Sequence, residues 1–443
     1  MAMVVKNNMS AISTLNTLNK NSSALAKSLQ KVSSGMKING AADDASGYAI
    51  SERMRVQIRG LDQANANTQN GSSMMKVAEG AVSSTVDILK TLKEKVINAA
   101  NDTNTDSDRQ TIQKELNQSI DQINDNANVT FNGKYLVDGS HNKKIQETST
   151  HLTNQSLSTN TSATSALKDL ADRNNNALNI HENDSVTISY VKQGKTYTTT
   201  FKVESNTLTD MVNKATAAAK AAGGATTADL KIANATSAIG KDSSGNTVYT
   251  ADGTSAITIS SGTKGGVDDQ ISGLTISITD SDGNINKSAN AVLDNFNESI
   301  RAENAGPDNS IVLQVGTKAN QAIKVGLSDM RSEALGLSGS DGTKLNISTQ
   351  VKANAAINVL DNAVQKALDQ QTTIGSIESR LEYTSSNLTT ASENVQAAES
   401  TIRDADMAKE MTNYTKNNVL LQAAQSMLAQ ANQSSSSVLS LLQ

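Results

Sequence analysis

The sequence predicts a mostly α-helical protein with a β-rich insert, in which coiled-coil helical terminal regions flank a central α+β region. Near each end, apolar residues recur at alternating spacings of three and four, the 3.5-residue period of a helix that keeps one narrow face against a partner. Between about residues 140 and 345 this period gives way to short alternating apolar runs separated by Gly, Ser, Thr, Asn and Asp.

The C-terminal pattern starts at Ile377 and keeps its spacing without a slip to Ala405. The helical signal then continues almost to the end of the chain, and no charged residue follows Lys416. Because a solvated helix usually keeps charges on its outer face, we expect this end to be covered on several sides.

The N-terminal pattern runs from Leu15 to Met36 at the same alternating spacing, which indicates that the two ends of the chain pair with each other. Many of the patterned residues are Ala, Ser or Thr and bury little apolar area per turn, so we expect the pair to need neighbouring copies. An ordinary monomeric helical bundle is the alternative. The larger apolar members of both patterns, here called the terminal seam, are Leu15, Leu18, Leu25, Leu29, Val32, Ile377, Leu381, Leu388, Val395, Ile402, Met411, Leu421 and Leu428.

Composition excludes several classes of function. The net charge is −5 and the basic residues form no dense run, which argues against nucleic-acid binding. Aromatic residues make up only 2% of the chain, fewer than the pocket of a compact enzyme usually needs. Cysteine is absent, so thiol and disulfide chemistry are excluded. No stretch approaches the roughly 20 apolar residues of a membrane span, and polar residues interrupt the N-terminus where a cleavable signal would need an apolar core.

Residues 1–40, which include the first helix, hold five lysines and no acid. A membrane-surface helix is the alternative to a basic outer face, but Asn and Ser dilute its apolar side. Gly35 and Gly40 break this helix, and Asp43 with Asp44 stands where the next helix starts. No third ligand for a metal lies nearby, so we expect these carboxylates to cap the helix.

Helical periodicity resumes near Tyr48 and continues to Ala99, and residues 101–107 form a turn into a third, antiparallel helix. A tight turn follows at Asn132-Gly133. In the insert we expect a hairpin over 184–203 with its turn at Gln193-Gly194-Lys195, a helix over 208–222 ended by Gly223-Gly224, and further strands. These strands are expected around Val248, 257–259 and 274–278, with a second hairpin from 311–316 and 321–325, before a helix resumes near Ser348.

No motif with catalytic or cofactor chemistry is complete. His181-Glu182 begins like a zinc-protease motif, but Ser185 stands where the second histidine is needed. The run from Asp280 to Asn284 resembles a calcium loop, yet its glycine comes too early and the closing glutamate is missing, so we expect a hairpin turn. We therefore expect no enzyme activity, no cofactor and no metal site.

Motifs at both ends resemble bacterial flagellin. On the N-terminal side they are Leu29 to Asn39, Asp43 to Ser51, Gln57 to Leu61 and Phe131-Asn132-Gly133. On the C-terminal side they are Leu313 to Gly316, Arg380-Leu381-Glu382, Ala397 to Ala408, Met427 to Asn432 and Val438 to Leu442. The resemblance covers about 1–140 and 310–443, and the insert carries no specific match.

The resemblance implies a subunit that assembles with itself into the flagellar filament outside the cell. Residues 1–45 and 400–443 would form inner coiled-coil helices, 46–145 and 310–399 a helical rod with a β-hairpin, and 146–309 the variable outer part. It also implies unfolded export through the flagellar type III apparatus, a chaperone that holds the C-terminal helix, and contacts with filament cap and hook-junction proteins. A hook–filament junction protein or a flagellin-like adhesin is the alternative.

The family's innate-receptor patch maps onto Leu89, Thr91, Glu94 and Glu115. Thr91 stands where the family usually has an arginine, so we expect weaker recognition by the host receptor.

Overall fold

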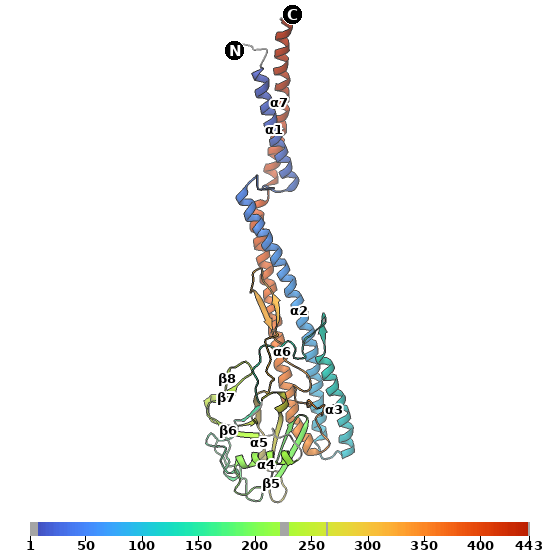
Figure 1. Cartoon of the computed structure of the whole chain (residues 1–443), viewed down its shortest axis with the longest axis vertical. Helices are drawn as coiled ribbons and strands as arrows, with labels where there is room; N and C mark the ends of the chain where they lie inside the picture. The colour runs from blue at the N-terminus through green and yellow to red at the C-terminus, as the bar shows by residue number, and fades with distance from the viewer. Residues whose placement is uncertain (1–7, 222–229, 263–264, 442–443) are drawn as a thin grey trace. The chain divides into compact units, whose positions relative to one another are not determined.

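The computed structural model describes residues 8–221, 230–262 and 265–441. The predicted helix end at Gly223-Gly224 lies outside these residues. The chain divides into two compact units. The terminal unit comprises residues 1–68, 314–321 and 383–443, and the central unit comprises 69–313 and 322–382. The predicted fold class is confirmed, because long helices at both ends of the chain flank a central region that contains the strands (Figure 1).

The helices are α1 Met9–Ser34, α2 Ala45–Ala99, α3 Asp106–Ala127, α4 Leu208–Ala221, α5 Lys287–Leu293, α6 Gln350–Arg403 and α7 Met407–Leu441. The strands are β1 Thr130–Phe131, β2 Lys134–Tyr135, β3 His151–Asn154, β4 Ser185–Lys192, β5 Lys195–Lys202, β6 Leu230–Ala235, β7 Ala238–Lys241, β8 Thr247–Tyr249, β9 Ala256–Ser261, β10 Ile271–Thr279, β11 Phe296–Ile300, β12 Ile311–Gln314 and β13 Ala322–Val325.

In the terminal unit, α1 and α7 run antiparallel and side by side (Figure 1). The Asn8 side chain donates to the carbonyl of Ala431 at 3.2 Å, and that of Asn21 donates to the carbonyl of Leu420 at 3.2 Å. A second contact in this unit packs Leu61 and Ala64 of α2 against Leu388 of α6. The expected pairing of the two chain ends is therefore present.

Two helix boundaries in the terminal unit depend on local caps. Gly35 ends α1 in the left-handed conformation (φ 71°), which glycine adopts without strain. Asp44 accepts hydrogen bonds from the backbone of Ser46 and Gly47 at 3.0 Å each, and Asp43 accepts one from the backbone of Asn39 at 3.1 Å. The capping role predicted for both carboxylates is thus confirmed for Asp44. Asp43 instead stabilises the loop before the helix.

The helical pattern expected from Ile377 to Ala405, and the helical signal beyond it, belong to two helices, and Ala405 lies between them. The helix α6 ends at Arg403, and α7 begins at Met407. Asp406 accepts hydrogen bonds from the backbone of Ala408 and Lys409 and so starts a new helix, a local bond that competes with helix continuation. The non-helical residues between them pair instead with the end of α1, since the backbone of Ala405 donates to the carbonyl of Gly35 at 2.9 Å.

In the central unit, a capping box of Thr105 and Asp108 starts α3. The buried Arg109 then donates to the carbonyls of Ala99 and Asn101 at 2.9 and 3.1 Å, which satisfies the exposed end of α2. This capped turn lets α3 return along α2 as predicted.

The insert contains two main antiparallel sheets, with strand orders β11-β3-β9-β6 and β10-β4-β5. A buried cluster of mainly leucine, isoleucine and valine side chains from both sheets and from α4 and α5 forms its core. The hairpin β4–β5 turns at Gln193-Gly194, and β12 pairs with β13, both as predicted. The expected turn at Asp280 is also present, because the Asp280 backbone donates to the Asn284 carbonyl at 2.8 Å.

Of the α-helices and strands given above, the strands β3, β6, β7 and β11 and the helix α5 escaped the prediction. Their sequences are short and rich in polar residues, and β3 acquires its place only by pairing with β9 and β11 on its two sides. The short α5 depends on Asn286, whose side chain accepts from the backbone of Ala289 at 3.0 Å.

Candidate assembly surface

The face that α1 turns toward α7 overlaps only partly with the predicted seam. Ser28 is buried at its centre and accepts a hydrogen bond from the Asn417 side chain at 3.0 Å. Of the predicted residues, Leu18, Leu25 and Val32 are half-buried on this side. The residues of α1 with reduced exposure on this side also include Ala11, Thr14, Asn21 and Lys31. The contact between the two helices is therefore narrow and partly polar.

Leu15 and Leu29, which the spacing assigns to the same seam, remain exposed by 45% and 52%. They lie one row to the side of Leu18 and Leu25 on the helix surface, so α7 does not cover them. We call the exposed apolar residues of the two helices the exposed terminal face. They are Met9, Ile12, Leu15 and Leu29 on α1, with Met407, Met411, Val419, Leu420 and Met427 on α7.

The seam residues of α7 divide in the same way. Leu421 and Leu428 are half-buried, Ala424 and Ala431 are buried, and Met411 remains 45% exposed. The side that meets α1 is thus built around small residues, and the larger apolar residues stay accessible. Single exposed apolar residues are ordinary, but this helix pair carries several, and association with other copies would cover them.

The seam residues of α6 are covered to different degrees. Leu381 is completely buried, Leu388 is 9% exposed, and Ile377, Val395 and Ile402 are half-buried. Val395 packs against the cluster of Leu61, Ala64 and Leu388. Within one chain these residues already have partners, unlike the exposed terminal face.

Arg403 is a structural residue that the sequence reasoning missed. Its guanidinium is buried and bonds to the Glu52 carboxylate at 2.8 Å and to the Ser51 hydroxyl at 3.3 Å, and it lies over the Tyr48 ring. The Arg403 hydrogen bond is the main cause that lowers the pKa of Glu52. A buried guanidinium requires such partners, and here they join the last residue of α6 to the first turns of α2. The one available signal was a charged residue directly after the seam residue Ile402.

The four residues of the predicted receptor patch differ in their exposure. Thr91 and Glu94 are exposed on α2, and Glu115 is half-exposed on α3 with an ion pair to Lys95 at 3.1 Å. Leu89 is completely buried, because it lies on the inward face of α2 with Val86 and Leu92. Leu89 is therefore not accessible on the surface of one chain, and the receptor patch stays a prediction.

No group of three or more His, Asp or Glu side chains within the described ranges is arranged to hold a metal ion. Across those same residues, no helix is both long enough and apolar enough to cross a membrane.

Comparison with known proteins identifies the family to which both ends of the chain are similar. Residues 5–142 match the bacterial flagellin N-terminal helical region, and residues 357–442 match the bacterial flagellin C-terminal helical region. A flagellin of Clostridium tyrobutyricum is 35% identical over 432 residues, which cover 97% of this chain and 99% of that protein. A flagellin of Bacillus subtilis (strain 168) is 30% identical over 461 residues, which cover 99% of this chain and all of that protein.

Among solved structures, a flagellar hook associated protein-3 of Legionella pneumophila is 16% identical with a TM-score of 0.33, over 78% of this chain and 97% of that one. The full-length relatives are flagellins, which favours the filament subunit over the hook–filament junction alternative. The chain therefore belongs to the bacterial flagellin family, as an exported, extracellular structural subunit of the flagellar filament rather than an enzyme.

Proposed function

We propose that this flagellin polymerises by burying the exposed terminal face of α1 and α7 against neighbouring copies. The observation that carries the proposal is the exposure of Leu15, Leu29 and Met427 on a helix pair whose own contact is narrow and partly polar. Burial of apolar surface contributes roughly 25 cal/mol per Å², so several half-exposed side chains on each subunit supply a driving force that the isolated pair lacks.

We also propose that the subunit divides into three layers. Residues 1–45 and 400–443 would form the inner layer, 46–145 and 310–399 the rod, and 146–309 the outer part. The non-helical residues 35–44 and 404–406 lie at the first boundary and bond to each other. The second boundary, between the rod and the outer part, is supported by a buried core formed by residues between Leu152 and Phe296.

Export and assembly partners would use the same terminal helices. The absence of charge after Lys416 and the exposure of Val419, Leu420 and Met427 favour a chaperone that covers α7 before assembly. We propose that the protein passes unfolded through the type III apparatus, and that cap and hook-junction proteins contact the terminal face at the filament ends. The exposed Thr91, Glu94 and Glu115 remain candidates for contact with the host innate receptor.

Replacement of both exposed leucines tests the assembly proposal. The double variant Leu15→Gln, Leu29→Gln is expected to keep the helix content of the monomer, since neither side chain is covered, but to lose polymerisation. The measurements are circular dichroism of the monomer and electron microscopy after seeding.

The matched control is Asn19→Gln, Ser23→Gln, which changes two exposed polar residues of the same helix and should polymerise normally. Filaments of ordinary length and yield from the leucine variant would show that the exposed terminal face does not drive assembly.

A further inference from the structure

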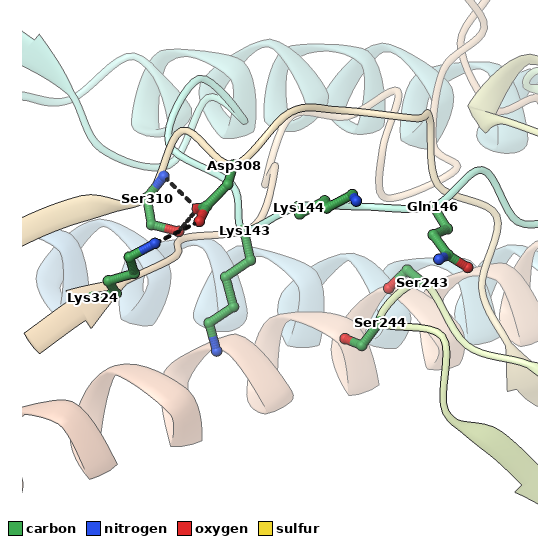
Figure 2. A pocket seen from close by; sticks show the side chains of 8 residues that line it. All are labelled: Lys143, Lys144, Gln146, Ser243, Ser244, Asp308, Ser310 and Lys324. Atoms are coloured by element: carbon green, nitrogen blue, oxygen red, sulfur yellow. Dashed lines mark hydrogen bonds and ion pairs between the residues drawn. The ribbon is translucent and has the colours of Figure 1, made fainter.

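A polar cleft in the central unit has no role in the proposed assembly. Its volume is about 470 Å³, within the range of small-molecule sites. Eight residues from four separate segments line it: Lys143, Lys144, Gln146, Ser243, Ser244, Asp308, Ser310 and Lys324. Figure 2 shows the Asp308, Ser310 and Lys324 side chains grouped at one end and Ser243 and Ser244 at the other, with Lys143 extending between them.

The walls of the cleft are fixed by backbone hydrogen bonds. Ile145 and Gly306 exchange two bonds of 3.1 Å, and the backbone of Asn309 donates to the carbonyl of Asn142 at 3.0 Å. On the other side, the backbone of Gln146 donates to the carbonyl of Ser243 at 2.8 Å. The stretch that carries both Lys143 and Lys144 is therefore held between the two walls.

Gly326 is necessary for the position of Lys143. A Cβ atom at Gly326 would lie within 2.3 Å of the Lys143 Cγ and 2.9 Å of its backbone nitrogen. Only glycine allows this close approach, so the backbone and stem of Lys143 are packed in place although its ammonium is exposed.

The charge of the cleft is positive. Its lining includes three lysines and one carboxylate, that of Asp308. Asp308 accepts hydrogen bonds from the Lys324 ammonium at 2.8 Å and from the Ser310 hydroxyl at 2.5 Å, and the Lys324 bond is the main cause that lowers its pKa to about 2. Lys324 thus neutralises Asp308, whereas Lys143 and Lys144 form no ion pair with any residue that the structure describes.

The remaining lining groups are three hydroxyls and one amide, with no aromatic or aliphatic side chain. This excludes the usual anchors of an apolar ligand and the stacking platforms that single-stranded nucleic acids require. A space several times larger than a phosphate ion, with donors for hydroxyl groups and two unpaired ammonium groups, suits a polyhydroxylated anion.

We propose that this cleft binds an anionic saccharide, a sugar that carries a carboxylate, sulfate or phosphate group. Because the cleft is open and lacks apolar contacts, we expect weak binding at one site, with a dissociation constant on the order of 1 mM. A filament presents many copies of the same cleft, so binding to a polymeric glycan would gain from multivalency. This inference does not depend on the proposed assembly face.

The test is calorimetric titration of the full-length monomer with a sulfated uronate disaccharide, with lactose as a neutral sugar of the same size. We expect saturable binding of the acidic sugar, which weakens as ionic strength rises, and none of lactose. The variant Lys143→Gln, Lys144→Gln should bind about five- to ten-fold more weakly. The matched control Lys231→Gln, Lys287→Gln makes the same charge change at exposed lysines outside the cleft and should bind as the unmodified protein does.

Asp308→Asn gives the sharpest result, because it removes the one carboxylate and frees Lys324. Binding of the acidic disaccharide should tighten about three-fold, an increase that damage to the fold would not produce. Equal affinity in the Lys143/Lys144 variant and its control would overturn the proposal, as would no saturation at about ten times the expected dissociation constant. Displacement by sodium sulfate at concentrations equal to those of the disaccharide would overturn the assignment to a sugar.

Discussion

Asp280 and Asp294 lie fourteen residues apart, before and after the helix α5. The fold shifts the pKa values of their carboxyl groups in opposite directions. Asp280 accepts hydrogen bonds from the side chain and backbone of Asn284, and these lower its pKa. Asp294 is largely buried at the end of α5, and desolvation raises its pKa to about 6. Its bond from the backbone of Ile276 at 3.1 Å offsets only part of that effect.

Asp294→Asn is expected to stabilise the insert at neutral pH. Burial disfavours the ionised carboxylate of Asp294 in the folded state. The protonated carboxyl group therefore makes its full contribution to stability below about pH 4, and this contribution is lost as the pH rises through about 6. Since one pKa unit corresponds to about 1.4 kcal/mol, the variant should gain about 3 kcal/mol above pH 6 and nothing below pH 4. Urea unfolding at several pH values, followed by the near-ultraviolet circular dichroism of the stacked Tyr190 and Tyr197, measures this gain.

Asp280→Asn is the control, because its expected effect on stability at neutral pH is opposite to that of Asp294→Asn. Its lowered pKa means that the ionised form stabilises the turn, so this variant should lose stability at neutral pH and recover relative to the parent as the solution becomes acidic. A gain for Asp294→Asn that does not depend on pH would contradict the electrostatic explanation.

Thr91→Arg tests the receptor patch. Thr91 is exposed, and its hydroxyl bonds only to the carbonyl of Asp87 within its own helix at 3.0 Å, so an arginine can replace it without repacking. We expect increased signalling in cells that carry the innate flagellin receptor, because the variant adds the charged group that the resemblance to flagellins leads us to expect at this position. Unchanged signalling, with Thr91→Gln as the uncharged control, would show that this position does not limit recognition.

Among the elements, the strand β10 packs directly against the helix α6 in the central unit. The side chains of Asn358 and Asn362 donate to the carbonyls of Leu274 and Ser272 at 2.8 and 2.9 Å. At the point of closest approach stands Gly273, where an added Cβ would lie 2.9 Å from the backbone nitrogen of Val359. This contact attaches the insert to one of the long helices.

Gly273→Ala should separate β10 from α6 and lower the free energy of unfolding by about 1–3 kcal/mol. Gly375→Ala is the matched control, because that glycine is also in the central unit but faces open space within α6, so the change should stabilise by about 0.5–1 kcal/mol. Urea midpoints of both variants give the comparison. Destabilisation of similar size in both would show that the β10–α6 contact is not the cause.

At the scale of the whole molecule, the proposed assembly uses the C-terminal end of the chain, which has no charged residue after Lys416. Deletion of 419–443 removes most of the exposed residues of α7 and the carbonyls of Leu420 and Ala431 that bond to α1. We expect monomers that do not polymerise, with the circular dichroism of Tyr190 and Tyr197 unchanged because their core is separate. Electron microscopy after seeding is the measurement, and normal filaments from this truncation would contradict the proposed role of α7.

Much of this architecture could be predicted from the sequence because it depends on local chemistry. The long helices follow from apolar spacing, the turns at Gln193-Gly194 and Asp280 from residues that adopt or stabilise turns, and the start of α2 from the Asp44 cap. The family can also be recognised from the sequence alone, because most of its motifs are contiguous runs of residues within the two terminal helical regions.

Tertiary contacts decided the rest. Spacing alone cannot determine which row of α1 meets α7, so it groups Leu15 and Leu29 with Leu18 although they lie exposed. The burial of Leu89 and the pairing of β3 are decided by how the elements pack, and the break before Met407 combines a local cap at Asp406 with a distant bond from Ala405 to Gly35. The cleft combines residues of the 143–146, 243–244 and 308–310 stretches with Lys324, and no periodicity indicates which segments fold together. A single sequence specifies local geometry through each residue's neighbours, whereas long-range packing selects which faces are covered.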